Sequence, residues 1–588
     1  MSAAETAAER PPSRRAPAAR VTGGRRRGGK VFGLALLVLL AVALVLRLVG
    51  FRHGLPFVYN ADENAHFVPR AIGMFGHSLN PDYFINPPAF TYLLHILYGI
   101  WWGGRDAVGA AFAADPSTAF AIARAAAAAC GVVAVGLLAW AGVRVLEARA
   151  AGLVAALLLA VAFLPVHYSH LALNDVPTLV GVCLSLAGTA GVYRRRARLG
   201  DFALAGVGLG LACATKYTGG IVLLPLLAAA AVTPGVSLPR RLGGLVLAGV
   251  LSGVAFLIAN PYALLDNAAF RDGLTQQSEA AGDAAGKLGQ TWHNGYGYYV
   301  WTLTWGLGWV PLLLAVGGAV WLAVRDWRLA LILIPAPIVL VFFLGSQGRY
   351  WARWLLPVYP MLCLLAVACA ANLAAWLAAR LRRARVAPIA LGVVAALAAV
   401  QGLVLSIHND RVLTREDTRQ LAREWLVKNT PEGAKMVVEP VFPDQWAMDP
   451  GHPSAVTGNG NRWRKFPTSR SLVNNDGTLR RGIGRVVKLE DYERTTRPQL
   501  LDTYLRGGYC WVVTGSTQYG RAQVAPGEVP NAIRYYDELR RRADVVYRVA
   551  PWKEPVRFSF DDSFNYRPLT YERPGPEIVI YRLRGCRP

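Results

Sequence analysis

Long apolar runs occupy most of the first two thirds of the chain, and they limit its fold more than any other feature. A helix needs about 20 mostly apolar residues to cross a bilayer. Several runs reach that length, and the first covers residues 31–50. Because 54% of the 588 residues are hydrophobic, we predict a polytopic α-helical membrane protein.

The charge of the chain predicts its topology. The net charge is +25, and the arginines gather in short loops between the apolar runs, as the positive-inside rule describes. A nucleic-acid-binding protein would instead present one basic face with interleaved aromatic residues. Residues 1–30 lack apolar periodicity, so we predict a disordered cytoplasmic tail. The run at 31–50 is a retained span, because this tail does not resemble the start of a signal peptide.

The basic loops all fall on one side if the apolar residues that follow Tyr92, up to Trp102, lie along the membrane interface. Their Tyr, His and Trp content suits the headgroup region. Lys216 lies near the middle of the run 202–232, which is too long for one untilted span and is predicted to be two helices meeting at the outer face. We then predict about eleven spans and an outer loop at 51–117. The spans are residues 31–50, 119–145, 152–167, 176–193, two within 202–232, 242–259, and four ending near residues 324, 345, 380 and 406.

The character of the chain changes at residue 408. Acidic and basic residues mix, helical spacing occurs at 414–429, and strands are predicted at 435–439 and 509–514. Residues 408–588 should therefore form a small extracytoplasmic α/β domain, after the transmembrane module of residues 31–407. Cys510 and Cys586 can form a disulfide if this domain is extracytoplasmic.

An acidic pair, Asp62-Glu63, follows the first span within the stretch from Asn60 to His66. Two carboxylates with a histidine three residues later stand where a membrane helix reaches water. They either cap a juxtamembrane helix, since acidic residues favour helix N-termini, or take part in chemistry.

Other polar and ionisable residues would meet this pair at the same face of the membrane. Ionisable groups at membrane depth are costly unless they are paired or functional. The set can be a group of ordinary ion pairs or an active site, and its position on one face favours a site. Its members are Asp62, Glu63, His66, Arg124, Asp175, Lys216, Arg349, Tyr350 and Arg353.

The order of several short motifs around the spans resembles the C-type membrane glycosyltransferases. The resemblance is stronger to the protein O-mannosyltransferase and aminoarabinose-transferase branch, whose members use polyprenyl-phosphate sugars. It covers about residues 31–407, and residues 425–439 are similar to the extracytoplasmic tails of bacterial members. The motifs are Asp62-Glu63, Pro87-Pro88, Asn174-Asp175-Val176-Pro177, Thr215-Lys216-Tyr217-Thr218-Gly219, and Arg349-Tyr350 with Pro357 and Pro360.

This resemblance implies a sugar donor whose lipid phosphate is a good leaving group. Such an enzyme needs a base for the acceptor hydroxyl and cations for the departing phosphate. In this family the first-loop aspartate is the expected base, which makes Asp62 the candidate here, with Glu63 beside it. Lys216, Arg349 and Arg353 are candidates for binding the phosphate through charge-assisted hydrogen bonds.

Supporting roles are assigned to the remaining members of the set. Glu63, His66 and Asp175 would orient the acceptor or the sugar, or hold a divalent ion. Metal dependence is left open. Arg124 and Tyr350 are further candidates for substrate binding.

The resemblance therefore predicts an inverting glycosyltransferase at the outer face of the plasma membrane. A single displacement would turn a β-linked lipid donor into an α-glycoside. Mannose is the sugar we favour, and the acceptor is a protein, a lipid or a cell-wall glycan. The alternative is a transporter or flippase for a lipid or a lipid-linked sugar. Transporters favour internal repeats, and none is visible in the sequence.

Overall fold

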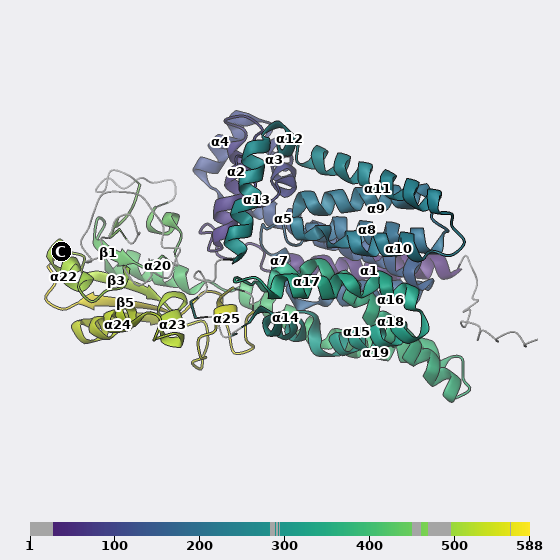
Figure 1. Cartoon of the computed structure of the whole chain (residues 1–588). Coiled ribbons are helices and arrows are strands. Elements are labelled where there is room, and N and C mark those ends of the chain that lie inside the picture. The colour runs from purple at the N-terminus through teal and green to yellow at the C-terminus, as the bar shows by residue number, and fades with distance from the viewer. Residues whose placement is uncertain are drawn as a thin grey trace, which may run out of the picture.

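The chain folds into a bundle of long apolar helices with a small sheet-containing domain at one end (Figure 1). This computed structural model describes residues 27–282, 288–289, 292, 294–440, 442–449, 460–467, 495–564 and 566–587. Residues 1–26 of the tail that we predicted for residues 1–30 lie outside the described residues. The first helix starts at Arg27.

The polytopic helical class predicted from the sequence is confirmed. Among the described residues, seven helices are long and apolar enough to cross a membrane, or eight if the bent pair α6–α7 is one span. The count of eleven spans stays a prediction. The helices of the bundle are α1 (Arg27–Leu48), α5 (Ser117–Leu146), α6 (Arg149–Val161), α7 (Phe163–Ser169), α8 (Thr178–Arg194), α9 (Leu199–Thr215), α10 (Leu223–Val232), α11 (Leu238–Ala259), α14 (Gly295–Leu303), α15 (Trp309–Arg325), α16 (Trp327–Leu333), α17 (Pro335–Gly345), α18 (Tyr359–Arg380) and α19 (Val386–Leu413).

The span predicted at residues 152–167 is broken in the structure. Helix α6 ends at Val161, Ala162 leaves the helical region with φ −56° and ψ 126°, and α7 continues at an angle of 58°. Pro165 in α7 lacks the N–H that a continuous helix would use to reach residue 161. The break places the end of α7 and the loop before α8 beside the first outer loop.

Close packing of α8 on α9 fixes two polar residues at the site. A side chain at Gly181 would lie 2.4 Å from the backbone nitrogen of Ala212, and one at Gly188 would lie 2.4 Å from that of Ala205. Small residues of this kind let two helices approach closely. As predicted, α9 ends beside Lys216, which is extended and precedes the short helix η2 (Tyr217–Val222). Asp175, just before α8, is thereby brought to Lys216.

Short elements cover the end of the bundle that faces the C-terminal domain (Figure 1). Helix α3 has 14 residues, too few to cross a bilayer. It contains the stretch after Tyr92 that we predicted to lie along the membrane interface, and that placement stays a prediction. The polar stretch after α11 contains a further helix, α13, which we did not predict. These elements are the π-helix η1 (Glu63–Phe67), α2 (Val68–Gly73), α3 (Ala89–Trp102), α4 (Arg105–Ala114), α12 (Tyr262–Leu265) and α13 (Asn267–Gly282).

The C-terminal domain contains a five-stranded sheet in the order β2-β1-β3-β5-β4. Strand β1 (Lys435–Val438) is parallel to β2 (Arg464–Lys465) and to β3 (Trp511–Gly515). Strand β5 (Ile578–Leu583) is antiparallel to β3 and to β4 (Ala543–Val549). The helices of this part are α20 (Thr418–Asn429), α22 (Leu500–Gly507), α23 (Ser516–Val524), α24 (Pro530–Arg542) and α25 (Phe560–Phe564).

Two apolar clusters cover the two faces of this sheet. One includes Leu539 of α24, and the other includes Leu426 of α20. Cys510, beside β3, and Cys586, after β5, form the disulfide that the sequence left open. The α/β character expected of residues 408–588 is present, although α19 continues to Leu413, through the boundary that we predicted at residue 408.

Candidate active site

A cavity of about 670 Å³ opens where the first outer loop meets the ends of the bundle helices. Its walls come from residues before and within η1, the turn before α8, the α9–η2 junction, α13, and the segment after α17. The polar and aromatic side chains that line it include Asn60, Asp62, His66, Tyr83, Asn174, Asp175, Lys216, Gln277, Arg349, Trp351 and Arg353.

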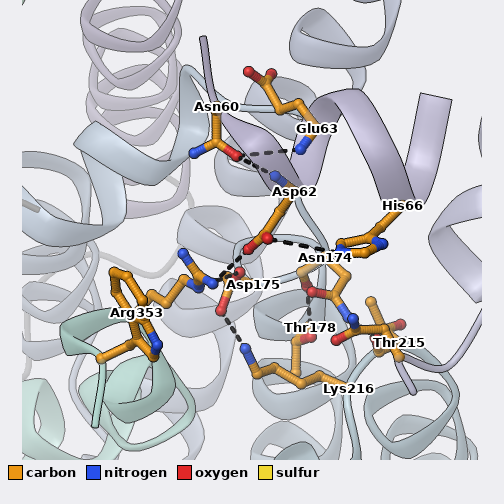
Figure 2. Close-up of polar contacts among 12 residues, drawn as sticks. Asn60, Asp62, Glu63, His66, Asn174, Asp175, Thr178, Thr215, Lys216 and Arg353 are labelled. Atoms are coloured by element: carbon orange, nitrogen blue, oxygen red, sulfur yellow. Dashed lines mark hydrogen bonds and ion pairs between the residues drawn. The ribbon is translucent and has the colours of Figure 1, made fainter. Parts of the chain in front are cut away.

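The acidic pair is held in a tight turn that sends its two side chains in different directions. Asn60 Oδ1 accepts hydrogen bonds from the backbone nitrogens of Asp62, at 3.0 Å, and Glu63, at 3.1 Å. Asn60 thus caps the turn that leads into η1. Figure 2 shows Asp62 pointing toward Arg353 while Glu63 points away from it.

Glu63 is fully buried and forms a bidentate pair with Arg124. Arg124 Nε and Nη2 donate to Glu63 Oε1 and Oε2 at 2.8 and 2.9 Å, and the Ala172 amide donates to Oε1 at 2.6 Å. Arg124 Nη1 also donates to the carbonyls of Phe51 and His53. Neither side chain lines the cavity. We predicted a catalytic or metal-binding role for Glu63 and a substrate-binding role for Arg124. The structure instead shows a buried ion pair between them, which we call the brace.

Asp62 faces the cavity and is about one third exposed. Its Oδ2 accepts a hydrogen bond from Arg353 Nη2 at 2.6 Å, and its Oδ1 lies 3.7 Å from His66 Nε2. The His66 ring stacks on Tyr83 with ring centroids 4.9 Å apart and an angle of 8°. Arg70 lies 4.3 Å above the Tyr83 ring. Burial raises the pKa of Tyr83 to about 12, so its hydroxyl stays protonated at neutral pH.

Arg353 bridges the two aspartates of the cavity. Besides its bond to Asp62, its Nε lies 3.7 Å from Asp175 Oδ2, and Lys216 Nζ donates to Asp175 Oδ1 (Figure 2). Asn174 Nδ2 donates to the Thr215 carbonyl at 2.7 Å, which fixes the turn before α8 against the end of α9. Carboxylates and cations from distant segments therefore meet in one place.

The charged groups of the cavity favour an anion. Its described lining contains two carboxylates, Asp62 and Asp175, and three cations, Lys216, Arg349 and Arg353. Lys216 and Arg353 are almost fully buried, where charge-assisted hydrogen bonds to a phosphate are strong. The arrangement suits a ligand that joins a phosphate to a group carrying hydroxyls.

Tyr350 does not take the position that we predicted. Its ring packs at 4.6 Å from that of Tyr298, and its hydroxyl donates to the Trp292 carbonyl. Among the described residues, Tyr350 is not part of the cavity wall, which argues against the substrate contact that we predicted for it.

The candidate metal ligands do not converge. Both oxygens of Glu63 accept bonds from Arg124, and Asp175 is engaged by Lys216. In the part of the chain that the structure describes, no three His, Cys, Asp or Glu side chains are arranged to hold a metal ion. Glu63, His66 and Asp175 therefore do not fit a divalent-ion site in this arrangement.

Several residues at the site were not predicted. The preference of asparagine for helix starts could have identified Asn60. Tyr83 and Trp351 carried no signal beyond being aromatic residues in outer segments. Gln277 lies in α13, whose weak apolar pattern gave no reason to place it at the cavity.

Comparison with known proteins adds a family likeness. Residues 110–259, which include Arg124, Asp175 and Lys216, match the family described as dolichyl-phosphate-mannose-protein mannosyltransferase. No curated protein matches the chain. The family match confirms the predicted resemblance to membrane glycosyltransferases that use polyprenyl-phosphate sugars, and with it the predicted class of enzyme. It does not favour the transporter alternative.

Solved structures that are similar to the chain include the following three. ArnT from Cupriavidus metallidurans bound to undecaprenyl phosphate is 17% identical, with 95% of this chain and 98% of that chain covered and a TM-score of 0.47. Archaeal oligosaccharyltransferase AglB from Archaeoglobus fulgidus, with an inhibitory peptide and a dolichol-phosphate, is 14% identical, with 86% and 72% covered and a TM-score of 0.49. The S. cerevisiae protein O-mannosyltransferase Pmt1-Pmt2 complex bound to the sugar donor is 18% identical, with 41% and 34% covered and a TM-score of 0.33. Because every TM-score is below 0.5, no residue role is transferred from these structures.

Proposed function

We propose that this chain is an inverting glycosyltransferase that takes a monosaccharide from a polyprenyl phosphate and attaches it to a hydroxyl group. The observation that carries the proposal is the cavity whose described lining brings Asp62 together with Lys216, Arg349 and Arg353. Mannose is the favoured sugar, supported by the description of the matching family. The acceptor would be a protein, a lipid or a cell-wall glycan.

The proposed site lies at the outer face of the plasma membrane, with the N-terminus in the cytoplasm. Two observations support this orientation. Helix α13, which contributes to the cavity wall, and the C-terminal domain lie at the same end of the bundle (Figure 1). That domain contains the disulfide Cys510–Cys586, and disulfides persist mainly outside the cytoplasm.

The proposed reaction is one displacement at the anomeric carbon. The acceptor oxygen forms a bond to that carbon while the bond from carbon to the phosphate oxygen breaks, and the bonding electrons leave with the phosphate. Asp62 accepts the hydroxyl proton, a step that general-base catalysis typically accelerates about 10²- to 10⁴-fold. Lys216 and Arg353 neutralise the charge that develops on the departing phosphate. Attack from the opposite face inverts the anomeric configuration.

The test is a transfer assay with the purified full-length protein in lipid nanodiscs. Polyprenyl-phosphate mannose and its glucose, galactose and aminoarabinose counterparts are supplied with hydroxyl acceptors, and the anomer of the product is determined. We expect transfer from the mannose donor with inversion. Retention of configuration would overturn the single displacement. Absence of transfer from every donor, together with movement of the lipid across a vesicle membrane, would overturn the enzyme in favour of a flippase.

A further inference from the structure

A short part of the C-terminal domain, helix α25 (Phe560–Phe564) together with Tyr566, is packed against the helix bundle. Figure 1 shows α25 between the sheet of that domain and the helices α7 and α14. The Tyr566 ring lies 5.7 Å from that of Phe163 and 5.1 Å from that of Trp305 and packs against the main apolar core of the bundle. Phe560 and Asp561 are each 3% exposed. The two parts of the protein are therefore joined by a buried contact next to the cavity.

The first contact is a hydrogen bond to the helix that supports Tyr350. Tyr298 of α14 donates from its hydroxyl to Asp561 Oδ1 at 2.7 Å, and both groups are buried. The Tyr298 ring packs at 4.6 Å from the Tyr350 ring. Asp561 thus fixes an aromatic side chain against the segment that also carries Arg349.

The second contact is a pair of tilted aromatic rings next to Arg353, a candidate for binding the phosphate. The Trp351 ring lies 5.2 Å from the ring of Phe560 and 5.0 Å from the guanidinium carbon of Arg353. On the side of the C-terminal domain, the Arg521 guanidinium lies 5.4 Å from the Phe560 ring. A series of rings and cations therefore connects α23 to the cavity wall.

Both contacts reach one five-residue segment, 349–353, which contains two of the three cations in the described lining of the cavity. A long arginine side chain loses conformational entropy when it binds a ligand. A guanidinium already held over an aromatic ring has less entropy left to lose, because that ring restricts its rotamers. The orientation of Arg353 therefore depends on Trp351, and that of Trp351 depends on Phe560.

We propose that Phe560 and Asp561 are positioning residues for the donor phosphate, so that the C-terminal domain forms part of the active-site support. This inference rests on the proposed function, since it assigns the phosphate to the cations of segment 349–353. It also gives the C-terminal domain a role that does not depend on the identity of the acceptor. If the interface only joined the two parts, substitutions at Phe560 or Asp561 would change stability and leave donor affinity unaltered.

The first test measures binding of sugar-free polyprenyl monophosphate to the full-length protein in detergent by native mass spectrometry. Phe560→Leu keeps an apolar side chain in place but removes the ring. We expect its affinity to fall about 2- to 10-fold, from the usual strength of one aromatic pair, while Phe560→Tyr keeps wild-type affinity. Tyr547→Ala is the matched control, because it removes a ring stacked on Trp425 within the C-terminal domain and away from the bundle. Wild-type affinity in Phe560→Leu would overturn the inference.

The second test asks whether Tyr298 and Asp561 act together. Tyr298→Phe and Asp561→Ala should each weaken binding of the monophosphate, and the double variant should be no weaker than the more affected single variant. Asp561→Asn should restore affinity, because its amide oxygen can accept the same hydrogen bond. Fully additive losses, or no rescue by asparagine, would overturn the coupling that the inference requires.

A transfer assay on the same variants separates this inference from the proposed function. We expect a higher donor KM with kcat nearly unchanged for Phe560→Leu. If the wild-type protein binds the monophosphate but transfers no sugar, the proposed function fails, while the binding results still decide the positioning role. If the wild type transfers sugar and all variants match it in donor KM and in monophosphate affinity, only the positioning role fails.

Discussion

Removal of the Glu63 carboxylate should destabilise the protein far more than removal of the carboxylate of its neighbour Asp62. Glu63 is 0% exposed and Arg124 is 1% exposed, and three hydrogen bonds from the Arg124 side chain and the Ala172 amide end on the Glu63 carboxylate. Glu63→Ala would leave the buried guanidinium without its charge partner, which typically costs about 3–5 kcal/mol. Asp62 is 35% exposed, and without it Arg353 would keep Asp175 as a second carboxylate partner at 3.7 Å, so loss of the Asp62 carboxylate should cost about 1 kcal/mol or less.

The assay is the free energy of unfolding of the full-length protein, measured by SDS titration in mixed micelles. Glu63→Gln with Arg124→Met removes both charges, so the double variant should be destabilised less than the two single changes added together. A loss below about 1 kcal/mol in Glu63→Ala, or equal losses in the Glu63 and Asp62 variants, would refute the division of the pair into a brace and a cavity residue.

Three further variants address other parts of the protein. Burial raises the pKa of Glu439, which follows β1, from 4.5 to about 8. The folded domain therefore holds that proton more tightly than the unfolded chain does. As the pH rises from about 4.5 to about 8, the free energy of unfolding should fall by on the order of 5 kcal/mol at most. Glu439→Gln should remove this pH dependence in thermal melts, and an unchanged profile would contradict the assignment. Cys510→Ser opens a disulfide that spans 76 residues and should lower the free energy of unfolding of the C-terminal domain by about 2–4 kcal/mol in urea titrations; an unaltered midpoint would argue against that contribution. Lys216→Met should weaken binding of polyprenyl monophosphate about 10- to 100-fold through loss of a charge-assisted hydrogen bond, and equal affinities would exclude Lys216 from the phosphate site.

The spans could be predicted because the thickness of the bilayer sets the number of apolar residues that each span needs. A run of apolar residues long enough to cross is visible without knowledge of its neighbours, and this identified α1, α5 and α11. The junction at Lys216 was also predictable, since a charge in the middle of an overlong apolar run requires a break. Proximity of Asp62, Asp175, Lys216 and Arg353 followed from placing segment ends on one side of the membrane.

The directions of individual side chains could not be predicted in the same way. Asp62 and Glu63 are adjacent and chemically similar, and only the turn capped by Asn60 decides which one faces the cavity. The pairing of Glu63 with Arg124 joins residues 61 positions apart. No local pattern could have indicated that Tyr350 turns away from the cavity while Arg349 lines it.

The contact between the bundle and the C-terminal domain was hidden for a similar reason. Tyr298 and Asp561 are 263 positions apart, and neither lies in a motif or a periodic pattern. Their meeting depends on how a short segment after β4 packs against α14. Interactions of this kind arise from tertiary packing, and no local pattern in a single sequence indicates them.

Sugar transfer by Asp62→Asn at saturating donor and acceptor tests the proposed base. We predict that this variant still binds polyprenyl monophosphate, because the cations remain, but that its transfer rate falls about 10²- to 10⁴-fold with the loss of the base. Asp82→Asn is the matched control, since Asp82 is an exposed carboxylate of the same outer loop outside the cavity. Transfer by Asp62→Asn at the rate of the wild type and the control would contradict the assignment of Asp62 as the base.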